Sequence, residues 1–329
     1  MAFDRRYLLL LILPLTVYAL VYAVLDPARP MQVTFPVIDR DAFPTVAGEE
    51  ARQRYFWLSA FTLLTAVALG IAMGAALSVW RLAPRRDRGL VFLLMAVVLG
   101  AVAAVELSGS VTSWYVYLGK NLFLSIFPYI RTGEHATAMQ AFLTGQAVIK
   151  IATAAALVPL AVGLVLTLSR PAEGATLAAR ARSLASATEQ QKAFLRHAAL
   201  LYVLALLAVW AWMYWPIPFL KDPPGSTTVT DAYNGLATGA LLLQGVAFSI
   251  GVAAIYLPPA LLLRHRAALL TRQIEDDPSD DGDEDADAVL AFLSVHPIDY
   301  LRQALALVLP ALVSLLPSLQ SIASALATG

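Results

Sequence analysis

The sequence contains no cysteine among its 329 residues. This absence excludes disulfide bonds, thiolate metal sites, iron–sulfur clusters and cysteine nucleophiles, but it does not identify the compartment in which the protein resides. Charge is also scarce, because charged residues make up only 14% of the chain and the formal net charge is zero. A chain without excess positive charge lacks the electrostatic basis for binding nucleic acid. We therefore expect no nucleic-acid partner.

The sequence motifs of common enzyme classes are missing as well. No GxSxG, GxGxxG, P-loop or HExxH pattern occurs, so a hydrolase, a dehydrogenase, a nucleotide-driven pump or a zinc protease is poorly supported. None of the four histidines (His135, His197, His265, His296) has a second histidine or a carboxylate at metal-ligand spacing in a helical context. We expect no metal site and no cofactor. A membrane enzyme that uses scattered residues ranks behind a non-enzymatic protein.

Apolar residues, by contrast, are abundant. They make up 59% of the chain and stand in long blocks, not in amphipathic stripes. A bilayer core of roughly 30 Å requires about 20 apolar helical residues to cross it. The fold class is therefore all-α: a polytopic membrane protein, a bundle of six or seven transmembrane helices in a lipid bilayer. The main bundle covers residues 1–272, with spans at about 7–25, 55–80, 89–107, 146–168, 198–220 and 235–263.

Both ends of the chain leave alternatives open. We interpret residues 7–25 as an uncleaved anchor, with a cleavable signal peptide as the competing interpretation. Residues 273–287 form an acidic linker that fits part of an EF-hand calcium loop, but Ala288 stands where a bidentate glutamate is needed. A solvated, disordered linker is favoured, and its charge suits contact with a basic partner or with the arginine-rich loops of the chain itself. Residues 288–329 contain an interfacial helix and a C-terminal hydrophobic segment, in which 304–326 is a candidate seventh span or a hairpin in the inner leaflet.

An aromatic segment at 114–129 follows the third span. A turn signal at residues 119–121 divides it into halves too short to cross a membrane. The segment either lies in the outer interface with its aromatic residues as anchors or is re-entrant, and a re-entrant segment would favour a channel.

The distribution of basic residues predicts the orientation of the spans. With the N-terminus inside, fifteen of the 23 Lys and Arg residues fall on the inner side, seven fall on the outer side, and Lys150 lies within the membrane. This bias agrees with the positive-inside rule. High usage of Ala, Leu and Arg indicates a GC-rich bacterial genome. We expect a multi-pass protein of the inner (cytoplasmic) membrane with a cytoplasmic N-terminus.

A few polar residues of the spans form a candidate intramembrane polar site. Glu106 and Lys150 fall at similar depth near the outer interface on consecutive spans, at about 1.5 Å of rise per residue, and we hypothesise that they pair. The alternative is that each side chain extends separately to the headgroups. Gln146, Lys150 and Thr153 share one helix face, and Pro159 follows on the same helix. This arrangement is typical of a cavity wall but also of passive helix packing.

Small residues define two candidate helix-packing faces. Ala66, Gly70 and Gly74 lie four residues apart in the second span. A second face in the sixth span consists of Ala240, Gln244, Ala247 and Gly251. Such faces permit close contact between helices, either within one chain or between chains.

Two classes of function remain. The first is a non-catalytic membrane component (an accessory subunit, scaffold or effector) that binds protein partners through its helix faces and its acidic linker. The second is a small-solute or ion transporter or channel that uses the polar face of the fourth span. The absence of a convincing internal repeat makes the second class less well supported than the first.

Overall fold

The computed structural model of the chain describes residues 3–25, 35–108, 122, 125–126, 135–169, 176–276 and 297–315. These residues are nearly all helical. Extended segments meet in this part only at an isolated antiparallel bridge between Val37 and Leu220. The helices in chain order are η1 (Arg5–Leu11), α1 (Ile12–Leu25), η3 (Arg40–Ala42), α2 (Phe43–Leu82), α3 (Arg88–Ser108), α5 (His135–Leu166), α6 (Leu177–Tyr214), η4 (Ile217–Phe219), α7 (Thr228–Asp276) and α9 (Pro297–Ser314).

Five helices in the described part of the chain are long and apolar enough to cross a membrane. Their spanning stretches are Phe43–Leu82, Arg88–Leu107, Gly145–Leu166, Ala179–Phe219 and Thr228–Gln273. The protein is therefore a multi-pass helical membrane protein. The 14-residue helix α1 and the apolar stretch Arg302–Ser314 of α9 are shorter. The predicted total of six or seven spans depends on these two segments.

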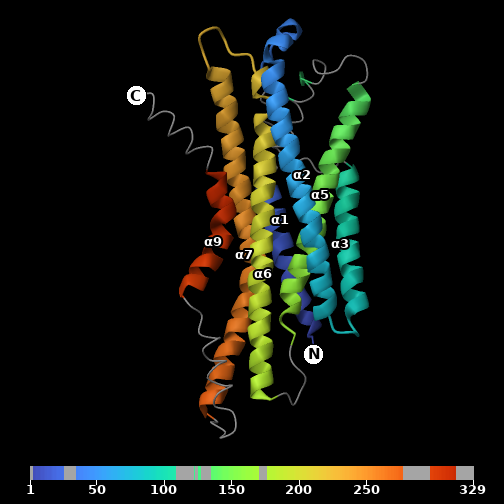
Figure 1. The fold of residues 1–329 in the computed structure, drawn as a ribbon, viewed down its shortest axis with the longest axis vertical. Helices are drawn as coiled ribbons and strands as arrows, with labels where there is room; N and C mark the ends of the chain where they lie inside the picture. Colours follow the sequence, from blue (N-terminus) through green and yellow to red (C-terminus); the bar gives the residue numbers. More distant parts are fainter. Residues whose placement is uncertain are drawn as a thin grey trace.

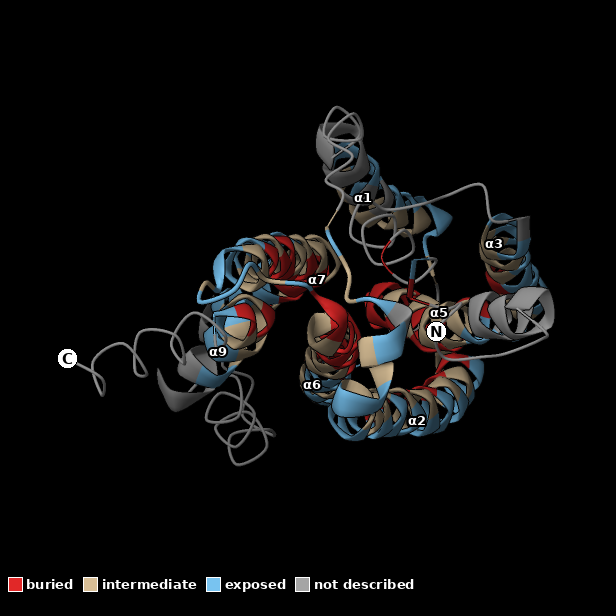
Figure 2. Cartoon of the chain, turned by 90° about the horizontal axis from the view of Figure 1, so that it is seen from above, coloured by how far each residue is buried: buried red, intermediate tan, exposed pale blue. Residues whose placement is uncertain are grey.

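The helices run up and down between two ends of an elongated bundle (Figure 1). We name one the basic end; it contains the N-terminus, the α2–α3 connection and the C-terminal end of α7. The opposite end, which contains residues 35–42 and the α6–α7 connection, we name the aromatic end. Viewed along the bundle, α1, α2, α3 and α7 lie around α5 and α6, and α9 packs against α6 and α7 (Figure 2).

Several helices are longer than a bilayer requires. Helix α2 has 40 residues, which corresponds to about 60 Å. It begins at Phe43, well ahead of the predicted span at 55–80, so the polar residues before Tyr55 continue the helix at the aromatic end. At the basic end, α6 begins at Leu177, so the alanine-rich residues before the predicted span at 198–220 are helical. Helix α7 continues through Pro258 and Pro259 and ends at Asp276.

The spacing of small and branched apolar residues explains how α2 packs. Ala60, Leu64, Ala68, Ala75 and Val79 follow one another at spacings of four or seven residues, so they share one face, and all are buried. This face contacts α5 and α6. The opposite side carries exposed apolar residues such as Leu69, Met73 and Leu77. Exposed apolar side chains along a helix of this length are suited to contact with lipid.

Helix α9 crosses the boundary predicted at residues 303 and 304. It runs without interruption from Pro297 to Ser314, and it packs along α7. The backbone N–H of Ala311 donates a hydrogen bond of 3.1 Å to the Ser249 hydroxyl of α7. This bond lies beside Pro310, a residue that cannot donate a backbone hydrogen bond. Residues 316–329 lie outside the described part, so the seventh span stays a prediction.

Candidate functional site

Glu106 and Lys150 form an ion pair between α3 and α5. Lys150 Nζ lies 2.7 Å from Glu106 Oε2, and the two side chains keep 32% and 19% of their exposure. Glu106 lies two residues before the end of α3 at the aromatic end, and Lys150 lies in the middle of the longer helix α5, so the two side chains meet at the same depth. The pairing that the sequence predicted is therefore present. Because the two charges are opposite and in contact, each offsets part of the free energy of placing the other in apolar surroundings.

The other two residues of the predicted polar face differ in how their polar groups are used. The Thr153 hydroxyl donates to the carbonyl of Ile149 at 2.9 Å, within its own helix. Gln146 lies one turn before Lys150, and its Nε2 is buried without a hydrogen-bond partner among the described residues. A buried amide without a partner is uncommon in folded proteins, so it marks a position where a water or another polar group fits.

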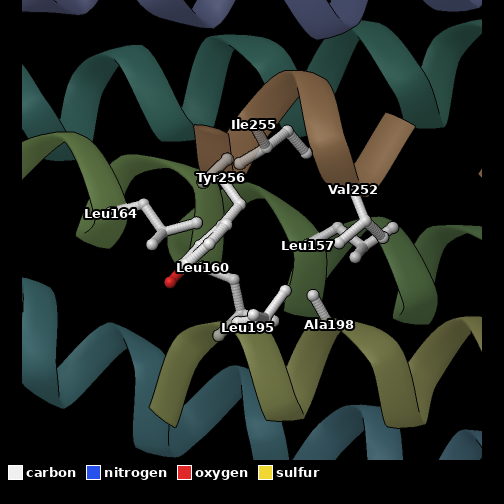
Figure 3. A pocket seen from close by; sticks show the side chains of 9 residues that line it. Leu157, Leu160, Leu164, Leu195, Ala198, Val252, Ile255 and Tyr256 are labelled. Carbon is white, nitrogen blue, oxygen red and sulfur yellow. The ribbon is translucent and has the colours of Figure 1, made fainter. Parts of the chain in front are cut away.

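The space beside the proline of α5 is small and apolar. A cavity of about 10 Å³ lies between α5, α6 and α7, and its side chains point toward one another in Figure 3. That volume is close to the minimum for a single water. Tyr256 contributes the one hydroxyl shown there, and this hydroxyl donates to Gln303 of α9 at 3.0 Å. The cavity wall otherwise consists of Leu157, Leu160, Ala161, Leu164, Leu195, Ala198, Val252 and Ile255.

The first predicted packing face does not contact the rest of the described chain. Ala66, Gly70 and Gly74 are exposed on α2, and a Cβ atom added at either glycine would have nothing within 4 Å. The interpretation that this face packs inside the chain therefore receives no support from the described residues. Use of the face by another chain stays a prediction.

The second predicted face is only partly used, and the closest approach involves a neighbouring residue. Ala240 is buried, whereas Gln244, Ala247 and Gly251 are half-buried. A Cβ atom at Gly251 would lie 3.9 Å from the Tyr202 hydroxyl, which is an ordinary contact. At Gly245, the added atom would overlap the Ser314 side chain and lie 2.8 Å from the Pro310 carbonyl oxygen. Sequence reasoning missed Gly245, although its spacing of four from Ser249 marks the face that meets α9.

A buried carboxylate at the aromatic end was also missed. Glu50 of α2 is 2% exposed, and its Oε1 accepts a hydrogen bond of 2.8 Å from Trp215 Nε1. Arg54, one turn later, places its Nε 3.4 Å from the same oxygen. Residues 43–54 lie between the predicted spans at 7–25 and 55–80, and in the structure they form the first turns of α2. The spacing of Glu50, Arg54 and Trp57 at four and seven residues is a helical signal that would have indicated a structured segment.

Aromatic and backbone contacts hold this end of the bundle together. The rings of Trp57 and Trp215 stack with centroids 6.4 Å apart, and those of Phe43 and Phe219 stack at 5.8 Å. The backbone N–H of Ile38 donates to the carbonyl of Phe219 at 2.9 Å. These contacts connect the residues before α2 to the α6–α7 connection.

Two predicted segments fall largely outside the described residues. In the aromatic segment 114–129, only residues 122 and 125–126 are described; Leu122 and Ile126 are buried in the same apolar cluster as Trp212 and Phe219. The interfacial and re-entrant alternatives for that segment lie outside the described part. The acidic linker 273–287 is described only up to Asp276, where α7 ends.

The described residues contain no group of three or more His, Asp or Glu side chains that could hold a metal ion. His197 and His265 are exposed. Comparison of the chain with models of known protein families, with curated proteins and with solved structures found no match. The function therefore has to be argued from the residues themselves.

Proposed function

We propose that this chain is a non-catalytic component of a bacterial inner membrane: an accessory subunit, scaffold or effector with six or seven spans and a cytoplasmic N-terminus. The observation that carries the proposal is the ion pair between Lys150 and Glu106. Each charge of the pair offsets part of the free energy of placing the other in apolar surroundings, which favours a structural contact between the two helices. The pair is suited to holding α3 against α5.

The interior of the bundle supports the same role. The space between α5, α6 and α7 is lined almost entirely by aliphatic side chains, and its volume is about 10 Å³. The outward face of α2 offers a place for a partner. Ala66, Gly70 and Gly74 leave room for a second helix to approach closely, as small residues do at helix contacts in membranes.

The test is native mass spectrometry of the protein extracted gently from its own membrane. We expect a different polypeptide in stoichiometric amount, which the Gly70→Leu variant loses because the leucine side chain fills the space for the partner helix. The matched control is Gly100→Leu on α3, which is also exposed with nothing within 4 Å of an added Cβ. If Gly70→Leu retained the partner, this face of α2 would not be part of the interface. A purified chain without any partner would contradict the accessory role.

A small-solute or ion transporter or channel is the alternative function, favoured by one specific observation. The Gln146 amide is buried without a partner in the described structure, one turn from Lys150. A solute that binds this amide would lie next to the ion pair. Flux of small ions into proteoliposomes that Lys150→Met abolishes would support transport, whereas absence of flux above that of protein-free liposomes would exclude it for the ions tested.

A further inference from the structure

The connection between α2 and α3 concentrates arginine in a short, tight turn. Its sequence from residue 81 to residue 88 contains four arginines and one aspartate. The backbone N–H groups of Asp87 and Arg88 both donate to the carbonyl of Pro84, at 2.9 and 3.1 Å, which closes the turn. Arg81, Arg85 and Arg86 are exposed. They make no hydrogen bond or ion pair within the described part of the chain.

The one acidic residue of this turn does not neutralise those three arginines. Asp87 is 8% exposed, and its Oδ1 accepts hydrogen bonds from Arg5 Nε at 3.1 Å and Arg5 Nη2 at 2.7 Å. The fourth arginine, Arg88, lies with its guanidinium 4.7 Å from the centre of the Trp80 ring and donates to the carbonyl of Ala83. Three guanidinium groups therefore have no counter-charge among the described residues at this corner of the molecule.

The helices next to the turn are the two spans with the least buried surface. Only 22% of the apolar window of α2 and 11% of that of α3 is buried inside the protein. Their exposed apolar residues continue almost to the turn, at Leu77 and Trp80 on α2 and at Leu90 and Leu93 on α3. An exposed tryptophan next to arginines marks the level of the lipid headgroups. The three guanidiniums thus lie where phosphate groups of the bilayer begin.

We propose that the α2–α3 turn is a binding site for the phosphate group of an anionic phospholipid, held by Arg81, Arg85 and Arg86. The planar guanidinium forms two parallel hydrogen bonds to phosphate oxygens, a geometry that the ammonium of lysine does not provide. The acyl chains of the same lipid lie along the exposed leucines of α2 and α3. Several arginines directly beside a span are the arrangement that attracts anionic lipids.

The acidic linker of the chain is the competing occupant by charge. It leaves the described structure at Asp276 at the end of α7 and returns at Pro297 at the start of α9. Both views place α7 and α9 on the opposite side of the bundle from α3 (Figures 1 and 2). The lipid headgroups, in contrast, adjoin the turn directly. The geometry therefore favours the lipid over the linker.

The test measures lipid retention by the purified full-length chain in detergent with native mass spectrometry. Phosphatidylglycerol is titrated against phosphatidylcholine as the zwitterionic reference. The test variant replaces three arginines of the turn (Arg81→Gln, Arg85→Gln, Arg86→Gln). The control variant removes the same net charge from exposed positions on α6 and α7 (Arg180→Gln, Arg196→Gln, Arg272→Gln). Circular dichroism confirms that each variant is folded before titration.

We expect the wild-type chain and the control variant to retain phosphatidylglycerol in preference to phosphatidylcholine. The turn variant should bind phosphatidylglycerol about tenfold or more weakly, since each arginine near a lipid surface contributes on the order of 1 kcal/mol. Equal binding by the turn variant and the wild type would overturn the proposal, as would equal weakening in both variants, which would indicate net charge alone. If phosphatidylglycerol bound only after the acidic residues of 277–287 had been replaced by Asn or Gln, the acidic linker and not the lipid would be the occupant of the turn.

Discussion

At the scale of single residues, the ion pair between α3 and α5 gives the sharpest prediction. Removing either charge leaves the other unpaired in largely apolar surroundings, so Lys150→Met and Glu106→Gln should each lower the melting temperature. The double variant should lose less than the sum of the two. Because both side chains are partly exposed, we expect a coupling of about 1 kcal/mol, in the range measured for polar pairs between membrane helices.

The control for this double-mutant cycle is the pair between Lys221 and Asp39 at the aromatic end. Its atoms are as close, at 2.6 Å, but its side chains are 52% and 78% exposed. Exposed pairs of this kind contribute little, so Lys221→Met should leave the melting temperature nearly unchanged. Strict additivity of the Lys150 and Glu106 substitutions would show that the contact has no energetic role.

The carboxyl group of Asp222, just before the start of α7, should make the stability of the folded protein depend on pH. It accepts hydrogen bonds from the Thr230 hydroxyl and from the backbone N–H groups of Thr230 and Val229. The hydroxyl contact, assisted by the backbone contacts and opposed by burial, holds the pKa of this carboxyl below its ordinary value of 3.8. A lowered pKa in the folded state adds stability above the unfolded-state pKa, and this stability is lost as the pH falls through the folded-state value.

The expected result is a pH-dependent gap between two melting curves. At pH 7 the melting temperature of the wild type should be higher than that of Asp222→Asn. This difference should shrink as the pH falls below about 4, where the carboxyl of the unfolded chain is protonated. Scanning fluorimetry in detergent between pH 7 and pH 3 measures the gap. A gap that stays constant across this range would mean that the charge of Asp222 does not contribute.

Some contacts could be predicted from the sequence and others could not. The difference depends on whether the depth of both residues in the membrane can be counted along their helices and on how far apart the two residues lie in the sequence. Glu106 and Lys150 were predictable because both depths follow from counting residues along two helices of fixed rise. Glu50 was not, because its burial depends on Trp215, a residue 165 positions away. Nothing near Glu50 in sequence indicates that an indole N–H will lie opposite its carboxylate.

At the scale of helices, apolar length predicted the spans but not which side of each helix would be covered. Small residues occur on several sides of α2 and α7, and composition alone does not distinguish a face that meets another helix from one that faces outward. Gly70 was predicted to pack and is exposed, whereas Gly245 was not singled out and has the closest neighbours. The covered side depends on where α5, α6 and α9 lie, which is set by the whole bundle.

A substitution at Gly245 therefore tests how closely α7 and α9 pack against each other. Gly245→Ala would place a methyl group against the Ser314 side chain and the Pro310 carbonyl oxygen, and a backbone atom cannot move aside without shifting α9. We expect destabilisation of about 1–3 kcal/mol, the usual effect of overpacking. The measurement is thermal unfolding, together with proteolysis near Pro297 to detect release of α9.

Gly239→Ala on the same helix is the matched control. An added Cβ at that position meets nothing within 4 Å, and alanine favours a helix interior over glycine, so this variant should be unchanged or slightly more stable. If Gly245→Ala behaved like Gly239→Ala, the close approach of α9 to α7 would be wrong.

At the scale of the whole molecule, the absence of cysteine makes the orientation of the bundle directly measurable. A single introduced cysteine is the only thiol in the chain, so its reaction with a membrane-impermeant maleimide reports the side on which it lies. Pro224 and Gln273 are both exposed, the first at the aromatic end and the second at the basic end. The predicted inner side of the chain, with fifteen Lys and Arg residues against seven on the outer side, includes the α2–α3 connection, so the positive-inside rule predicts that the basic end lies in the cytoplasm.

Intact cells that carry Pro224→Cys should therefore be labelled, whereas Gln273→Cys should react only after the membrane is opened. The reverse pattern would invert the whole bundle, and labelling of both in intact cells would contradict a single orientation. The result also determines which compartment reaches the ion pair. Glu106 lies two residues before the end of α3 at the aromatic end, so in the predicted orientation the ion pair is nearer to the outer side of the membrane, and a solute that approaches Gln146, one turn before Lys150 on α5, would have the shorter path from that side.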